Sequence, residues 1–259
     1  MQDAARVFIT GASSGIGAAL AAHYAAQGAT LGLLARRGEA LAALIATLPH
    51  PERHRAYAAD VLDHAALHGA AEQFIAYAGE VDIVIANAGI SHGTLTEHAE
   101  DLPVFESILA TNVTATVATF SPFIATMRNQ RTPARLVGIA SVAGIRGLPG
   151  GAGYSASKAA VISYCESLRV EMRPYGIKVV TIAPGYIDTP MTQRNAYAMP
   201  FLMRPERFAE AAARAIARGD SYRVIPWQMG IVAKVLRLLP NTLYDWAFAK
   251  APHKARKTS

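Results

Sequence analysis

The chain has 259 residues, of which 52% are hydrophobic and 17% are charged, and its formal net charge is +6. This length suits one α/β domain, and the apolar fraction excludes a disordered chain. Residues 221–259 hold seven of the 25 basic side chains and one of the 19 acidic ones, so residues 1–220 are neutral overall. Basic proteins often bind nucleic acid, but here the excess charge belongs to a C-terminal segment. We therefore expect no nucleic-acid partner.

Cysteine usage and hydropathy narrow the class further. The single cysteine, Cys165, excludes an internal disulfide and provides no zinc-type cluster, so we expect a small core residue and no bound metal. The first residues lack a long apolar segment, and no run of about 18 apolar residues occurs. We expect neither a secretory signal nor a membrane-spanning helix, and hence a cytoplasmic protein.

Short apolar segments alternate with longer alanine-rich ones along the chain. The alanine-rich segments predict helices up to about residue 27 and over 39–47, 64–78, 104–127 and 154–173. Strands that alternate with such helices are typical of βαβ units with parallel strands and right-handed connections. The sequence therefore predicts one domain, residues 1–228, built on a doubly wound parallel sheet with helices on both faces. The apolar segments predict its seven strands, at 6–10, 30–35, about 57–60, 82–87, 135–140, 178–183 and 223–225.

A glycine-rich turn follows the first predicted strand and leads into a helix. It reads TGASSGIG over residues 10–17. Glycines let a pyrophosphate approach the backbone, and a helix N-terminus provides free N–H groups and a partial positive charge. The spacing is G-x-x-x-G-x-G rather than G-x-G-x-x-G, and a glycine cluster alone is also typical of an ordinary tight turn. Its place at the end of the first strand predicts a dinucleotide-binding site.

The end of the second predicted strand indicates which dinucleotide is bound. Sites for NAD commonly place Asp or Glu here, where the carboxylate binds the ribose hydroxyls. This chain has Ala35 followed by Arg36 and Arg37, whose guanidinium groups suit a 2′-phosphate. A solvated basic pair at a helix start is the simpler alternative, although cations there oppose the helix dipole. The pair favours NADP(H), with NAD(H) as the other candidate.

A serine, a tyrosine and a lysine follow the fifth predicted strand. Ser141 ends the strand, and Tyr154 and Lys158 are four residues apart on one face of a helix. A tyrosine with a reference pKa of about 10 is a poor base at neutral pH, and a nearby ammonium group favours its phenolate form. A serine at this end of a strand can bind a substrate oxygen. Each residue alone also fits a turn or surface position, but together they predict acid–base chemistry.

Together these motifs resemble the short-chain dehydrogenase/reductase family over roughly residues 6–225. The resemblance implies a Rossmann-type fold with strand order 3-2-1-4-5-6-7. It also implies an oxidoreductase that transfers hydride between the nicotinamide C4 and a substrate carbon. The matching elements are TGASSGIG at 10–17, Asp60-Val61, NAG at 87–89, Asn112, Ser141, YSASK at 154–158, and Pro184-Gly185 followed by Thr189.

The same resemblance implies a role for each matching residue. Tyr154 is expected to be the general acid in reduction and the general base in oxidation. Lys158 is expected to lower the pKa of Tyr154 and to bind the nicotinamide ribose. Ser141 is expected to hold the substrate oxygen, and Asn112 a water that connects Lys158 to solvent. The residues expected to contact the cofactor are Gly11, Ser13, Ser14, Gly15, Ile16, Gly17, Arg36, Arg37, Asp60, Val61, Asn87, Ala88, Gly89, Tyr154, Lys158, Pro184, Gly185, Ile187 and Thr189.

Residues of about 186–205 are expected, from the family, to form a mobile lid over the substrate. The segment contains Met191 and the run at 199–203, MPFLM, and such side chains line adaptable apolar pockets. They fit an anchor between lid and core equally well. We therefore expect a hydrophobic carbonyl or alcohol as substrate. We expect His92 and His98 to be loop residues near the mouth of the cleft. The resemblance puts Arg146 on the substrate side, where it could meet an acidic group, but we expect a solvated loop arginine.

Two surfaces predict larger partners. The helices at 104–127 and 154–173 are the usual dimer faces of the family, so we expect a homodimer or homotetramer. The second helix carries apolar residues with few charges, namely Val161, Ile162, Tyr164, Cys165 and Leu168.

The second surface is a C-terminal helical extension at 229–259. Its apolar residues at helical spacing, with Trp246, Lys234 and Arg237 nearby, are typical of a helix that lies on a membrane surface. Packing of this helix on the lid or on another subunit would give the same pattern. Peripheral contact with the inner face of a membrane is thus one of two expectations for this segment.

The leading function is an NADP(H)-dependent carbonyl reductase or alcohol dehydrogenase. A non-catalytic NADP(H)-binding sensor is the alternative from a different class. Such a sensor would not need the proton relay that Asn112, Ser141, Tyr154 and Lys158 imply, so the sequence favours the enzyme.

Overall fold

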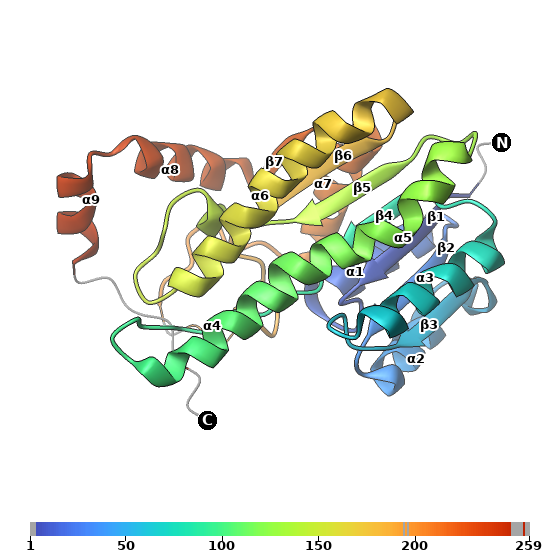
Figure 1. Ribbon diagram of the computed structural model, residues 1–259, viewed down its shortest axis with the longest axis horizontal. Coiled ribbons are helices and arrows are strands. Elements are labelled where there is room, and N and C mark those ends of the chain that lie inside the picture. The colour runs from blue at the N-terminus through green and yellow to red at the C-terminus, as the bar shows by residue number, and fades with distance from the viewer. Residues whose placement is uncertain (1–3, 194, 196, 250–255, 257–259) are drawn as a thin grey trace.

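A computed structural model describes residues 4–193, 195, 197–249 and 256. Its centre is a seven-stranded sheet in the order β3-β2-β1-β4-β5-β6-β7 (Figure 1). Each neighbouring pair of strands is parallel, so the predicted doubly wound sheet and its strand order are confirmed. The strands are β1 (Arg6–Thr10), β2 (Thr30–Ala35), β3 (His54–Ala58), β4 (Ile83–Ala86), β5 (Arg135–Ile139), β6 (Lys178–Pro184) and β7 (Tyr222–Ile225).

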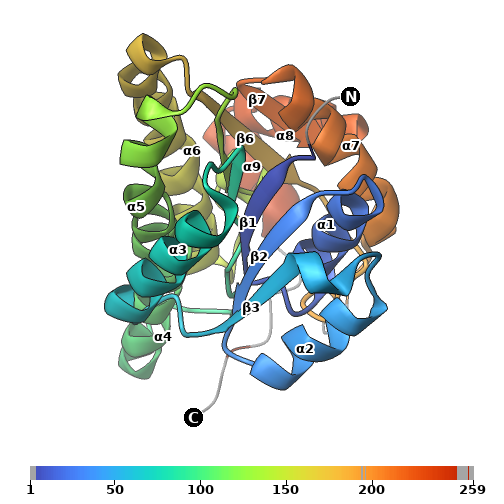
Figure 2. The same ribbon diagram turned by 90° about the vertical axis from the view of Figure 1, so that its right-hand side faces the viewer.

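Helices cover both faces of the sheet (Figure 2). One layer contains α1 (Gly15–Ala26), α2 (Gly38–Thr47) and α7 (Pro205–Arg218), and the other contains α3 (His64–Ala78), α5 (Ala115–Asn129) and α6 (Ala152–Met172). Successive side chains of a strand point to opposite faces. Val7 and Ile9 of β1 therefore pack in the hydrophobic core on one face of the sheet, and Phe8 packs in the core on the other face. Because both faces are buried, the strands are almost continuously apolar.

One helix and one strand end differ from the sequence prediction. Helix α7 was not predicted, although Pro205 and Glu206 in its first turn are typical of a helix start. β3 ends at Ala58, two residues before the predicted Asp60. β3 is an edge strand with mostly exposed side chains, so its apolar pattern is weak.

The predicted helix over 104–127 is a continuous helical stretch with a π-helical segment inside it. α4 (Leu102–Leu109) passes into the π segment Ala110–Thr114 and then into α5. Among the described residues, Ala99–Asn129 is the one helix long and apolar enough to cross a membrane. This helix has a high mean hydropathy without an unbroken apolar run of about 18 residues, so the expectation of no membrane-spanning helix stays a prediction. Because Phe120 and Phe123 are fully buried against the sheet, the composition also fits a core helix and is weak evidence of a membrane span.

Two further helices, α8 (Trp227–Leu238) and α9 (Asn241–Phe248), follow the sheet. Arg146, in the loop after β5, fixes them to the rest of the fold. Its guanidinium group donates to the carbonyl oxygens of Leu236 and Leu239 at 2.8 and 2.9 Å and lies 4.0 Å from the Tyr244 ring centroid. Arg146 is thus a helix C-cap rather than the solvated loop residue that the sequence predicted.

Candidate active site

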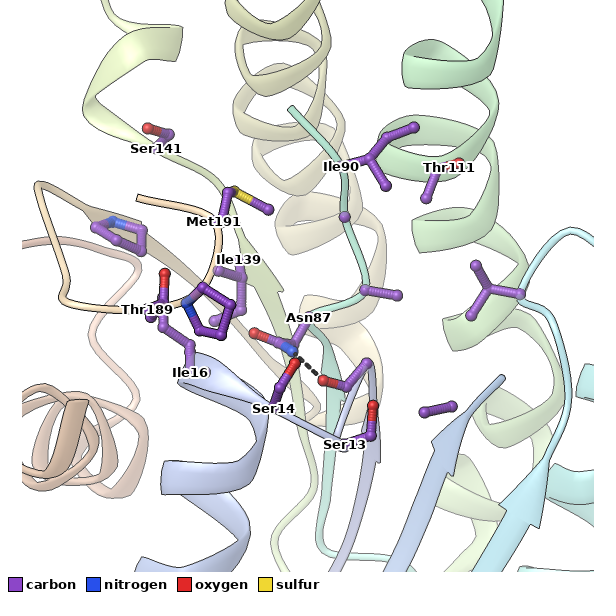
Figure 3. A pocket seen from close by; sticks show the side chains of 18 of the residues that line it. Ser13, Ser14, Ile16, Asn87, Ile90, Thr111, Ile139, Ser141, Thr189 and Met191 are labelled. Carbon is purple, nitrogen blue, oxygen red and sulfur yellow. Dashed lines mark hydrogen bonds between the residues drawn. The ribbon is translucent and has the colours of Figure 1, made fainter. Parts of the chain in front are cut away.

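A cavity of about 510 Å³ lies at the carboxyl ends of the strands, beside the junction of β1 and β4 (Figure 3). Open α/β sheets bind ligands at this point, where the strand order reverses. Of the predicted site residues, Gly17 and Asn112 do not line the cavity. Those that do are Gly11, Ser13, Ser14, Gly15, Ile16, Arg36, Arg37, Asp60, Val61, Asn87, Ala88, Gly89, Ser141, Tyr154, Lys158, Pro184, Gly185, Ile187 and Thr189.

The glycine turn has no room for side chains at two positions. A Cβ atom at Gly17 would lie 2.4 Å from the Gly11 carbonyl oxygen, and one at Gly11 would lie 2.8 Å from the Ala88 Cα. Gly11 also has a φ of +66°, a conformation that other residues rarely adopt. The turn therefore holds the start of α1 directly against the end of β4.

Asn87 ties these two segments together. Its side-chain amide donates to the carbonyl oxygens of Thr10 and Gly11 at 3.0 and 3.2 Å, and its backbone N–H donates to the Thr10 hydroxyl. Figure 3 draws its bond to the glycine turn, with Ser13 and Ser14 beside it. The side chain of Asn87 thus shapes the turn as well as lining the cavity.

Two arginines lie where the second strand reaches the cavity. The Arg37 guanidinium donates to the Ser13 hydroxyl at 3.1 Å, and Arg36 lies 3.8 Å from a carboxylate oxygen of Asp60. The Arg36 side chain is 72% exposed, so this ion pair is weak. Both cations are therefore available to an anionic ligand beside Ser13.

Ser141, Tyr154 and Lys158 meet at the end of β5. Ser141 is buried, and its hydroxyl accepts from the Ala143 N–H and is hydrogen-bonded to Tyr154. The Lys158 ammonium donates to the Ile139 carbonyl at 2.8 Å and lies 5.8 Å from the centroid of the Tyr154 ring. The spacing of four residues along α6 thus turns both groups toward the end of β5 and Ser141, which lies two residues beyond that strand.

Burial determines the ionisation of this pair. It raises the pKa of Tyr154, and the hydrogen bond with Ser141 opposes that shift only in part. Burial also lowers the pKa of Lys158 to about 8. The expected lowering of the Tyr154 pKa by Lys158 is therefore not what this geometry gives, because desolvation outweighs other effects. At neutral pH the phenol is protonated and the ammonium group keeps most of its charge.

Asn112 lies behind the cavity within the π segment. Its amide donates to the Ile90 carbonyl at 3.0 Å and to the Ser157 hydroxyl at 2.9 Å, and its oxygen accepts from the Ile90 N–H at 2.8 Å. π segments are frequent at functional sites. Both amide hydrogens of Asn112 are used by protein atoms, so its side chain joins α6 to the loop after β4. The predicted water-binding role stays a prediction.

Sequence analysis missed several positions at this site. Gly144 packs so closely on α6 that a Cβ atom there would lie 2.6 Å from the Lys158 carbonyl carbon. Its position just after Ser141 is the available sequence signal. Cavity-lining residues that were given no role are Ala59, Leu62, Ile90, Ser107, Thr111, Ile139, Ala140, Pro190 and Thr192. Ile90, Ile139 and Ala140 adjoin predicted motifs, and this proximity could have identified them.

The predicted lid is fixed at its base. Ile187 is buried and pairs with Met203, and Thr189 lies over the glycine turn, where a Cβ atom at Gly15 would be 3.2 Å from its methyl group. Met191 lines the cavity, whereas Phe201 is half exposed. Both interpretations of the apolar lid residues thus apply, because some anchor the segment and others face the site.

No cluster of three or more metal-ligating side chains occurs among the described residues. His98 lies near Glu97 and Glu100 at the surface, which fits a loop residue. The Cys165 side chain is buried in the core, as predicted.

Comparison with known proteins identifies the family. Residues 5–199 match the short chain dehydrogenase family. An uncharacterized oxidoreductase of Myxococcus xanthus is 38% identical over 92% of this chain and 94% of its own length. A 3-oxoacyl-[acyl-carrier-protein] reductase of Chlamydia trachomatis is 31% identical over 83% of this chain and 90% of its length.

A solved structure agrees with these relatives. The 3-ketoacyl-(acyl-carrier-protein) reductase of Brucella melitensis, complexed with NADH, is 26% identical, covers 87% of this chain and 98% of its own, and superposes with a TM-score of 0.78. The family match, the glycine turn against β4 and the Ser141–Tyr154–Lys158 group at one cavity lead to the same conclusion: the chain belongs to the short-chain dehydrogenase family of oxidoreductases.

Proposed function

We propose that the chain is an NADP(H)-dependent oxidoreductase that interconverts a carbonyl compound and a secondary alcohol by hydride transfer. One observation carries the proposal. Ser141, Tyr154 and Lys158 line the same cavity as the glycine turn, so a proton donor and a dinucleotide site share one space. A site of this kind needs both, because reduction of a carbonyl takes up a hydride and a proton.

The residues present fit a nicotinamide dinucleotide. The tight contacts at Gly11 and Gly17 fix the turn against the end of β4, with the N-terminus of α1 beside the cavity. A helix N-terminus presents free N–H groups that suit a pyrophosphate. Gly89 has a similar constraint, since a Cβ atom there would lie 3.1 Å from the Asn112 oxygen and 3.5 Å from the Lys158 ammonium. When bound, the nicotinamide supplies or accepts the hydride.

Arg36, Arg37 and Ser13 support NADP(H) over NAD(H). The loop holds two cations and a hydroxyl group beside the cavity, and β2 ends in Ala35 without a carboxylate. Asp60 is nearby, but it follows β3 and lies beside Arg36. The test is fluorescence titration of wild type, Arg36→Asp and Arg37→Asp with NADPH and NADH. Wild type should bind NADPH more tightly, and each variant should lose that preference. A wild-type preference for NADH would contradict the assignment.

The protein's own groups account for the proton step. In reduction, Tyr154 gives its phenolic proton to the carbonyl oxygen, which becomes the alcohol hydroxyl. Its raised pKa keeps that proton in place at neutral pH. Ser141 holds the same oxygen through its hydroxyl group, and the Lys158 ammonium stabilises the phenolate that remains. Oxidation of the alcohol runs through the same groups in reverse.

A hydrophobic substrate is favoured by the apolar side chains at the mouth of the cavity. Met191 and Ile90 line it, and Tyr186 and Tyr197 of the lid contact each other with ring centroids 6.3 Å apart. The similarity to a 3-oxoacyl-[acyl-carrier-protein] reductase agrees with a substrate that has an apolar chain. A panel of ketones should show the highest kcat/KM for long apolar ones, and preference for small polar ketoses would contradict this.

The catalytic role is tested by Tyr154→Phe. Loss of the general acid should lower kcat by about 10²- to 10⁴-fold, while NADPH still binds with near wild-type affinity. Phe fills the same volume, so folding should be retained. Near wild-type turnover would exclude Tyr154 as the general acid. Absence of turnover by the wild type itself over a panel of carbonyl compounds would favour the sensor alternative, in which the chain binds NADP(H) without catalysis.

Assembly and location complete the proposal. We expect a homodimer or homotetramer through α5 and α6, in a cytoplasmic protein. However, the apolar residues assigned to the partner face of α6 do not support it well. Val161, Cys165 and Leu168 are buried in the protomer's own core, because they pack on the sheet. Light scattering tests the assembly, and a monomer would contradict it.

A further inference from the structure

The outward face of α8 carries apolar side chains where a surface helix normally carries polar ones. Trp227, Ile231, Val235 and Leu238 follow one another at spacings of four, four and three residues, which places them on one side of the helix. Their exposed fractions are 65%, 55%, 54% and 83%. An exposed apolar stripe of this kind is typical of an interaction surface.

The opposite side of α8 already packs on the protein. Met229, Gly230 and Ala233 are buried, and Met229 lies directly against Gly185 at the end of β6. The apolar stripe is therefore additional to the residues that hold the helix in place. The lid does not cover it in the described part of the chain, so packing on the lid does not account for it.

Helix α9, which follows α8 along the chain, carries two further exposed apolar side chains. Leu243 and Trp246 are exposed, and the Arg146 guanidinium and the Tyr244 ring hold the two helices on the loop after β5. We call Trp227, Ile231, Val235, Leu238, Leu243 and Trp246 the α8–α9 face.

Charge identifies what this face binds. Lys234 and Arg237 are exposed on α8, which has no acidic residue, and the one acidic residue of 221–259 is Asp245. A second copy of the chain packed face to face would bring the cations of both copies together, because a twofold interface uses the same patch twice. An anionic bilayer instead attracts the cations and takes up the Trp, Ile and Leu side chains.

We propose that the α8–α9 face docks this protein on the surface of an anionic phospholipid bilayer. The helices lie on the membrane, since neither is long enough to span it. Docking would set the loop that carries Ser141 and Arg146 near the lipid, because Arg146 binds the carbonyl end of α8. The binding itself does not depend on catalysis or on the substrate.

Intrinsic fluorescence tests this directly, because the chain has two tryptophans and both belong to the α8–α9 face. Titration with phosphatidylcholine vesicles that contain phosphatidylglycerol should shift the emission to the blue, and pure phosphatidylcholine vesicles should bind at least about tenfold more weakly. Trp227→Phe and Trp246→Phe, each leaving one reporter, should both keep part of the shift.

Double variants test whether vesicle binding depends on the α8–α9 face in particular. Ile231→Ser/Leu238→Ser and Lys234→Glu/Arg237→Glu keep both tryptophans and should each weaken cosedimentation with anionic vesicles by about tenfold or more. The matched controls are Leu102→Ser/Val170→Ser, which changes two similarly exposed apolar residues elsewhere, and Arg53→Glu/Arg131→Glu. Both controls should bind as wild type does.

Three outcomes would overturn the proposal. One is absence of binding of wild type to anionic vesicles. Another is unchanged binding of Ile231→Ser/Leu238→Ser. The third combines two results: the wild type does not bind vesicles, and sedimentation velocity shows that it is an oligomer whereas Ile231→Ser/Leu238→Ser is a monomer. That result would make the face an interface between copies of the chain.

Discussion

The cavity at the carboxyl end of the sheet and the outer face of α8 are opposites in the same chain. At the cavity and directly behind it, polar groups are buried, with Lys158 at 4% and Asn112 at 0% exposure. On α8, apolar groups are exposed. Both regions depart from the usual distribution of residues in a folded protein, and both departures cost stability in isolation. They differ in how the cost is met. The buried polar groups have hydrogen-bond partners in neighbouring segments, whereas the apolar stripe has no partner within the described chain.

This difference explains what each region can do. The buried polar groups are fixed in position by their hydrogen bonds, as acid–base chemistry requires. The exposed apolar groups gain stabilisation only from something outside the protomer. Substitutions at the cavity should therefore have large effects on ligand binding, catalysis or stability. Substitutions of the exposed residues of α8 should change the free energy of unfolding only a little. The following predictions test that contrast, from the largest expected effect to the smallest.

Gly17→Ala should have the largest effect on the cavity. The new methyl group would meet the Gly11 carbonyl oxygen at 2.4 Å, so the turn must move away from β4. A shift of that size should weaken NADPH binding by roughly 100-fold, measured by fluorescence titration. Gly69→Ala in α3 is the control, since nothing lies within 4 Å of its Cβ position and alanine favours a helix. Equal affinities for wild type and Gly17→Ala would show that the turn does not bind the cofactor.

Asn112→Ala should destabilise the fold by about 2 kcal/mol in urea denaturation. The change leaves the half-buried Ile90 N–H without its acceptor and removes the amide that donates to the buried Ser157 hydroxyl. Ser157→Ala removes one of these bonds and should cost about half as much. If Asn112→Ala unfolds at the wild-type urea midpoint, the hydrogen bonds at the π segment do not hold it together.

Lys158 should give the pH profile of kcat/KM an inflection near pH 8. Burial lowers its pKa to about 8, so the ammonium group is charged below that pH and neutral above it. Without the charge, Lys158 stabilises neither the Tyr154 phenolate nor an anionic cofactor, and kcat/KM should fall about tenfold per pH unit above 8, equivalent to about 1.4 kcal/mol.

Lys158→Arg is the control for that inflection. Arginine stays charged over the whole range, so residual activity of this variant should lack the decrease near pH 8. The same decrease in both proteins would assign it to another group.

Arg146→Ala should lower the free energy of unfolding by about 1 kcal/mol, because the carbonyl end of α8 loses its donor. Arg146→Lys keeps the charge but not the planar guanidinium group, so its free energy of unfolding should lie between those of wild type and Arg146→Ala. This residue joins the two contrasted regions. If the loss in kcat/KM, expressed as a free energy, exceeds the loss in the free energy of unfolding, α8 positions the loop after β5.

Leu238→Ser should have the smallest effect on stability. The side chain is 83% exposed, so its replacement should change the free energy of unfolding by less than about 0.5 kcal/mol. A loss of several kcal/mol would mean that the stripe is covered in the free protein, and the contrast with the cavity would fail.

The sequence predicted these two regions unequally. Most of the predicted site residues line the cavity, because short motifs at strand ends must converge where parallel strands end together. Contacts between distant segments were not predictable, such as the Asn112–Ser157 bond or the fit of Gly144 on α6, since they depend on packing rather than spacing. The pattern of α8 predicted an amphipathic helix but could not tell which side faces the protein. Arg146 was misinterpreted because its partners lie about 90 residues further along the chain.

The last described residue of the C-terminal segment affects the order in which the structure can form. Arg256 donates to Glu100 and to the buried Asp101, whose pKa it lowers, and its backbone pairs with Gly93. Asp101 and Arg256 are 155 residues apart, so the loop after β4 is synthesised long before its partner. During synthesis on the ribosome, the sheet and the glycine turn can assemble while the loop at 93–101 still lacks its ion pair. This loop therefore gains its partner only after Arg256 has been translated.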